Sequence, residues 1–104
     1  MNPTELAKIR SGTIRWLLLY TIDQTRPQGI YTEALLAIMQ GTYQDATHRE
    51  IRRELDYLEE RGLVHIAKDP LDRWFVKLDR YGIEVVQYTC PCDPGISRPT
   101  ITQA

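Results

Sequence analysis

Residues 47–64 read THREIRRELDYLEERGLV, and this stretch predicts the helix around which the fold is built. Thr47 and Glu50 fit a capping box, in which the threonine side chain accepts a hydrogen bond from the amide of Glu50 and the glutamate reaches back. Apolar residues then follow at helical spacing: Ile51, Leu55 and Leu58. Because residues three and four apart share one face of a helix, the pattern predicts a helix from about residue 48 to 61.

Beyond this helix the hydrophobic period becomes the alternating one of strands. Gly62 stands where a left-handed residue commonly ends a helix. Residues 63–66 and 74–78 are rich in branched and aromatic side chains and predict two strands. The intervening Asp69-Pro70-Leu71-Asp72 is typical of a turn, so the two strands form one hairpin. Asp79 is then expected to cap a short final helix.

Two further helices are expected before residue 47. The first is predicted from Thr4, a possible cap, to about residue 22, with a kink or break possible at Ser11-Gly12. Its apolar stripe would comprise Leu6, Ile9, Ile14, Leu17 and Leu18. The second helix is expected to begin with Thr32 as its cap and to end at Gly41.

The order helix, helix, helix, hairpin, helix indicates a winged helix-turn-helix, an α+β fold that is mainly helical. We expect this domain to cover residues 1–90 and an extended, proline-containing tail to cover residues 91–104. The predicted core comprises Leu17, Leu35, Ile51, Leu55, Leu58 and Trp74.

Several function classes find no support in the sequence. The glycines are scattered and form no phosphate-binding loop, and no serine or cysteine has a recognisable base beside it, so we do not expect an enzyme. Cys90 and Cys92 are far in sequence from both histidines, so no metal or other cofactor is expected. No secretory signal is recognisable, and the longest apolar run, Trp16–Tyr20, is too short to span a membrane. These features predict a soluble, cytoplasmic protein.

Charge is unevenly divided along the predicted helix of residues 48–61. Its first half carries basic side chains and its second half acidic ones. In helix-turn-helix proteins the N-terminal part of the recognition helix meets the base edges, so this polarity suits a helix that enters the major groove. The alternative is a solvated face with local ion pairs. The chain as a whole has a formal net charge of -1, so DNA binding would require the positive charge to gather on one face.

Seven residues are therefore candidates for DNA contact: Thr47, His48, Arg49, Arg52, Arg53, Lys68 and Arg73. Arg49 and Arg53, four residues apart, share one side and are expected to reach guanine edges, whereas Arg52 is expected to reach a phosphate. Lys68 and Arg73 flank the hairpin turn, where Asp69 and Asp72 partly offset their charge.

The same stretch, residues 47–64, resembles small winged-helix proteins encoded by Mu-like phages and prophages. The resemblance continues through residues 74–78, Arg80-Tyr81-Gly82 and the tail segment 93–99. It implies a winged-helix fold, a phage-derived origin and a presumed DNA-binding role.

Together these observations predict a sequence-specific, double-stranded-DNA-binding transcriptional regulator that acts as a homodimer through its first and last helices. The alternative is a winged-helix module that binds a phage or host protein. A contiguous positive face on the third helix would favour DNA, and a neutral or apolar face would favour protein.

Overall fold

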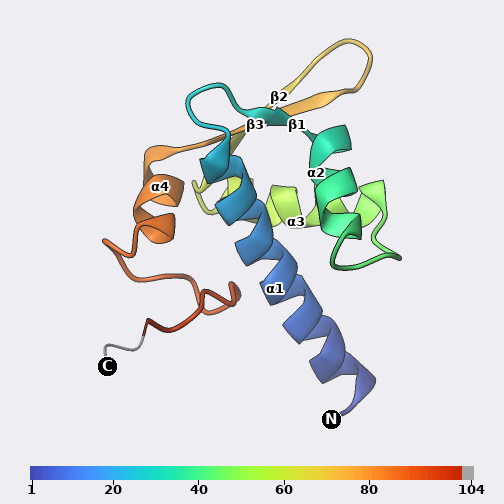
Figure 1. The fold of residues 1–104 in the computed structure, drawn as a ribbon, viewed down its shortest axis with the longest axis vertical. Coiled ribbons are helices and arrows are strands. Elements are labelled where there is room, and N and C mark those ends of the chain that lie inside the picture. Colours follow the sequence, from blue (N-terminus) through green and yellow to red (C-terminus); the bar gives the residue numbers. More distant parts are fainter. Residues whose placement is uncertain (102–104) are drawn as a thin grey trace.

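A computed structural model describes residues 1–101 and has an α+β architecture, about half of it helical (Figure 1). Its elements, in chain order, are α1 (Pro3–Gln24), β1 (Ile30–Tyr31), α2 (Thr32–Gln40), α3 (His48–Glu60), β2 (Val64–Lys68), β3 (Trp74–Leu78) and α4 (Arg80–Val86). The predicted order of helices and hairpin is therefore observed. None of the helices in residues 1–101 is both long enough and apolar enough to cross a membrane.

The sheet has three antiparallel strands in the order β1-β3-β2, one more than the predicted hairpin. In the additional pairing, Ile30 lies opposite Val76 and Tyr31 opposite Phe75. A strand of two residues has no alternation for a sequence pattern to reveal. Its pairing with β3 exists because the turn after α1 returns the chain to the edge of the hairpin (Figure 1).

The Thr47 cap and the left-handed Gly62 form at the two ends of α3 as the sequence predicts. The Thr47 side chain accepts a hydrogen bond from the amide of Glu50 at 3.2 Å. At the other end Gly62 has φ +74°, and the amide of Leu63 donates to the carbonyl of Leu58 at 3.0 Å. This pair of features is a Schellman cap. The prediction that the Glu50 carboxylate reaches back within the capping box was wrong, since it binds Arg10 on α1 instead.

The N-terminal caps of α1 and α2 differ from the predicted ones by one or two residues. Asn2, not Thr4, accepts a hydrogen bond from the amide of Glu5 at 2.9 Å, and Pro3 then occupies the first turn, where it needs no amide proton. Tyr31 is the cap residue of α2, so Thr32 is already helical and is buried. The helix α1 is continuous through Ser11-Gly12.

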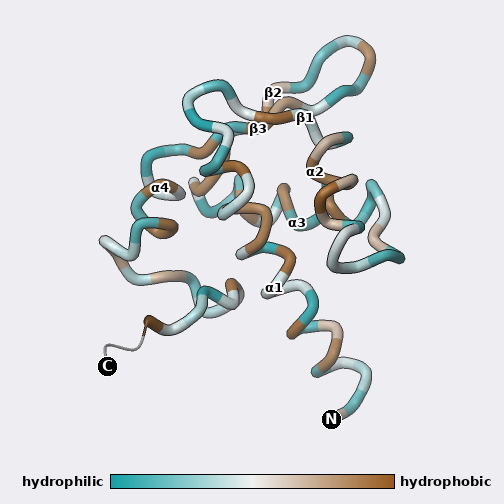
Figure 2. The backbone as a smooth tube through the Cα atoms, viewed as in Figure 1, coloured by the Kyte–Doolittle hydropathy of each residue, from teal (hydrophilic) through white to brown (hydrophobic). Residues whose placement is uncertain are grey.

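The core lies where α1, α2 and α3 meet the sheet. Five of the six predicted core residues are buried there, while Leu17 is only partly buried. The buried face of α1 is Ile14, Leu18, Leu19 and Ile22. Leu6 and Ile9 were predicted to belong to this face but are 55% and 49% exposed. The first turns of α1 extend past the rest of the molecule, so no element covers them (Figures 1 and 2).

The described part of the tail, residues 91–101, returns along α1, and Ile96 is buried in the core cluster. The amide of Ser97 donates to the carbonyl of Gly12 at 3.1 Å. A β-carbon at Gly12 would collide with the Ser97 hydroxyl, so this glycine allows the close approach of the tail. Residues 102–104 of the predicted tail lie outside the described residues.

Candidate nucleic-acid interface

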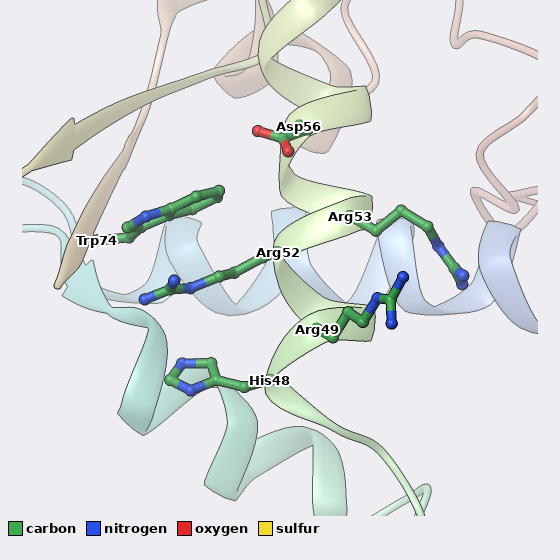
Figure 3. A pocket seen from close by; sticks show the side chains of 6 residues that line it. All are labelled: His48, Arg49, Arg52, Arg53, Asp56 and Trp74. Carbon is green, nitrogen blue, oxygen red and sulfur yellow. The ribbon is translucent and has the colours of Figure 1, made fainter. Parts of the chain in front are cut away.

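The exposed side of α3 borders an open hollow of about 510 Å³, which we call the α3 hollow (Figure 3). It is lined by His48, Arg49, Arg52, Arg53, Asp56 and Trp74. Four of the seven predicted contact residues are therefore brought together, and the hairpin contributes Trp74. Three arginines and one carboxylate give this surface a positive balance.

Arg49 and Arg53 extend to the same side of α3, away from Trp74 (Figure 3). Both residues are exposed. Within residues 1–101 no acidic group forms an ion pair with Arg49, and Arg53 only approaches Glu54, at 3.3 Å. Two guanidinium groups are thus presented to solvent from the first half of the helix, with most of their donors unused.

Arg52 points the other way and binds the hairpin. Its guanidinium donates to the Asp72 carboxylate at 2.9 Å and to the Asp72 carbonyl at 2.6 Å. It also lies over the Trp74 ring, 4.6 Å from the centroid. The hydrogen bond from Arg52 holds the pKa of Asp72 below its usual range. Arg52 therefore fixes the hairpin relative to α3 in the free protein.

Thr47 and His48 serve the start of α3. Besides the cap made by Thr47, the Nε2 atom of His48 lies 2.9 Å from the hydroxyl of Thr32, the buried first residue of α2. This contact joins the starts of α2 and α3. Both residues are thus placed to orient the basic half of α3 relative to α2.

Lys68 and Arg73 lie on the hairpin outside the α3 hollow. The Lys68 ammonium is 4.4 Å from the centroid of Trp74. Arg73 pairs with Asp69 at 2.8 Å, and hydrogen bonds from the Arg73 amide and side chain keep the pKa of Asp69 low. Much of the hairpin's charge is therefore compensated within the hairpin or by Arg52.

The sequence analysis did not predict which groups the acidic side chains of α3 bind. Glu50 pairs with Arg10 at 2.9 Å, and Glu54, only 1% exposed, pairs with Arg15 at 2.9 Å. Glu59 accepts a hydrogen bond from the amide of Ile66. These carboxylates are used to hold α3 against α1 and β2. Because the two arginines lie about 40 positions earlier in the chain, no local pattern could reveal the pairs.

A second cluster anchors the tail to the inner side of α3. The guanidinium groups of Arg15 and Arg61 each lie 3.5 Å from the centroid of Tyr57, one on each face, since both cannot share one face at that distance. The Tyr57 hydroxyl donates to Asp93, which also accepts from Arg61 at 3.0 Å. The hydrogen bond from Tyr57 lowers the pKa of Asp93, and burial raises the pKa of Tyr57.

Within residues 1–101 no three His, Cys, Asp or Glu side chains are grouped so that they could hold a metal ion, and Cys90 and Cys92 are free thiols. The candidate site is thus a surface of arginines on a helix. Comparison of the chain with protein-family models and with curated proteins finds no match to either.

Proposed function

We propose that this chain is a winged helix-turn-helix protein that binds double-stranded DNA sequence-specifically and regulates transcription in the cytoplasm. One observation carries the proposal: Arg49 and Arg53 project from the same exposed side of the first half of α3, while Glu50 and Glu54 are paired with α1. The exposed surface is consequently more basic than the composition of the helix. A helix with this polarity suits the major groove.

In this proposal Arg49 and Arg53 bind guanine edges, where a bidentate arginine contact contributes about 1–3 kcal/mol of discrimination. Thr47 and His48 set the start of the recognition helix. Arg52 is a positioning residue that holds the β2–β3 hairpin as the wing, and Lys68 and Arg73 lie toward the flanking backbone. The resemblance of residues 47–64 to winged-helix proteins of Mu-like phages and prophages supports a regulator of phage origin.

The protein would act as a homodimer that places two recognition helices on a two-fold symmetric site. The uncovered Leu6 and Ile9 on α1 and the partly exposed Tyr81 on α4 supply apolar surface for the contact. Sedimentation at tens of micromolar is expected to give a species of twice the 12.1 kDa chain mass. A single 12.1 kDa species would overturn the dimer.

DNA binding is tested by selecting duplexes from a random library and measuring affinity for the selected and an unrelated duplex at two salt concentrations. Arg49→Ala and Arg53→Ala should each weaken binding to the selected duplex about 5- to 150-fold and reduce its preference over the unrelated one. Arg80→Ala is the matched control, because Arg80 is highly exposed but lies on α4, outside the α3 hollow. Equal binding of both duplexes by the parent and all variants would reject the proposal.

One observation favours a second function, a winged-helix module for a phage or host protein. Leu71 at the hairpin tip is 77% exposed and stands between Asp69 and Asp72. An apolar side chain flanked by acids suits a protein contact better than a phosphate contact. A chain that binds no duplex, but loses a protein partner on Leu71→Ala, would support this function instead.

A further inference from the structure

A second hollow, of about 550 Å³, lies between the first half of α1 and the returning tail, and we call it the α1–tail groove. Its walls include Lys8 and Ser11 from α1, Ser97 from the tail and Arg53 from α3. The tail forms its wall because the Ser97 amide binds the Gly12 carbonyl and the Gly95 carbonyl accepts from Arg15 at 2.9 Å. The groove is thus built by contacts between segments 80 or more residues apart in the chain.

The groove is lined by cationic and hydroxyl hydrogen-bond donors, and one of its cations has no acidic partner in the described chain. Lys8 is exposed and forms no ion pair within residues 1–101. The side chain of Arg53 is 66% exposed. Glu54 lies behind the wall and pairs with Arg15 and more loosely with Arg53, so one buried carboxylate is shared by two of the three cations that line the groove. Within the described chain no acidic side chain lines the groove, and Ser11 and Ser97 add hydroxyl donors.

The α1–tail groove continues the surface of α3. Arg53 lines both this groove and the α3 hollow, so the two hollows meet at its side chain. A duplex contacted by Arg49 and Arg53 would therefore bring its sugar–phosphate backbone toward Lys8. Phosphate oxygens accept hydrogen bonds from ammonium, guanidinium and hydroxyl groups, which are the groups present there.

We propose that the α1–tail groove binds a backbone phosphate of the DNA that α3 reads, with Lys8 as its principal ligand. This inference rests on the proposed function and extends it, because it assigns part of the DNA footprint to α1 and the tail. Lys8 was not among the sequence candidates, since it lies about 40 residues before the recognition helix.

The test compares Lys8→Gln with the parent on the selected duplex over a salt titration. Loss of one phosphate contact should reduce the slope of log affinity against log salt by roughly one unit. The affinity ratio of parent to variant should therefore fall about fourfold between about 50 and about 200 mM salt. Lys8→Arg should restore the parent slope, and Lys77→Gln, an exposed lysine outside both hollows, should leave it unchanged.

A second measurement identifies the phosphate. Each backbone phosphate flanking the selected site is replaced in turn by a neutral methylphosphonate. One replacement should weaken binding of the parent and have no further effect on Lys8→Gln. If Lys8→Gln keeps the parent affinity and salt slope while Arg49→Ala loses binding, the groove assignment is overturned and the proposed function stands. If the parent itself binds no duplex, both are overturned.

Discussion

The charged side chains on the two sides of α3 differ in whether they have ion-pair partners. On its inner side the charges have close partners: Glu54 pairs with Arg15, Arg15 and Arg61 stack on Tyr57, and Asp93 accepts from Tyr57 and Arg61. On its outer side Arg49 has no acidic partner within residues 1–101, and Arg53 has only a weak one. The inner charges therefore stabilise the fold, and Arg49 and Arg53 on the outer side remain available to a ligand, whereas Arg52 is bound to Asp72.

This difference shows why the net charge of the chain does not describe the charge of the α3 surface. A formal net charge of -1 is unfavourable for DNA binding, but Glu50 and Glu54 of α3 are paired with arginines of α1. Each pair also uses an arginine of α1, so the net charge is unchanged, but the Glu50 and Glu54 charges are neutralised on the helix that an approaching duplex would meet. The comparison predicts that inner-side substitutions reduce stability, whereas outer-side substitutions reduce binding alone.

The largest effect is expected from the apolar inner side. Leu55→Ala should lower the free energy of unfolding by about 2–5 kcal/mol, because Leu55 is fully buried and its removal leaves a cavity. Denaturant titration measures the change, and Leu71→Ala, at an exposed leucine, is the control, expected within about 0.5 kcal/mol. An unaltered midpoint for Leu55→Ala would contradict the packing of α3.

A smaller loss is expected at the inner ion pair. Glu54→Gln keeps the shape of the side chain but leaves Arg15 without its charged partner, which should cost about 1.5–3 kcal/mol. Glu60→Gln on the same helix is the control, since the Glu60 carboxylate is exposed and 3.9 Å from Arg61. Equal thermal stability of the two variants would show that the inner pair contributes no more than a surface pair.

A substitution on the outer side should leave the stability of the fold almost unchanged. Arg49→Ala is expected to change the unfolding free energy by no more than about 0.5 kcal/mol, because the side chain is exposed and makes no ion pair in the described chain. Calorimetry on the variant used for DNA binding checks this expectation. A fall in melting temperature as large as that of Glu54→Gln would mean that the two sides do not differ.

A loss smaller than that of Glu54→Gln, and dependent on pH, is expected at the tail anchor. The pKa of Asp93 is lowered in the folded state, so its contribution to stability is present above the ordinary carboxyl range and is lost as pH falls through the folded-state pKa. Asp93→Asn should cost about 1 kcal/mol at pH 7, and its difference from the parent should shrink below about pH 4. Urea titrations at several pH values measure it, and a difference that is constant with pH would argue against the anchor.

Local patterns accounted for much of the fold. The capping threonine, the stripe of Ile51, Leu55 and Leu58 and the left-handed Gly62 all depend on residues within a few positions of one another. The interpretation of Ser11-Gly12 as a possible break was wrong because the role of Gly12 depends on a distant segment. Gly12 serves a contact with Ser97, 85 positions away, which no local pattern encodes.

By itself, the sequence determined where the three main helices and the hairpin form, and which arginines lie on the first half of α3. Hydrophobic periodicity and helix capping depend on residues a few positions apart, so they can be recognised in the sequence. Only the tertiary structure decided which charges are neutralised, that β1 joins the sheet, and that Lys8, Arg53 and the tail line one groove. Such contacts join distant segments, and their partners are selected by packing around the common core.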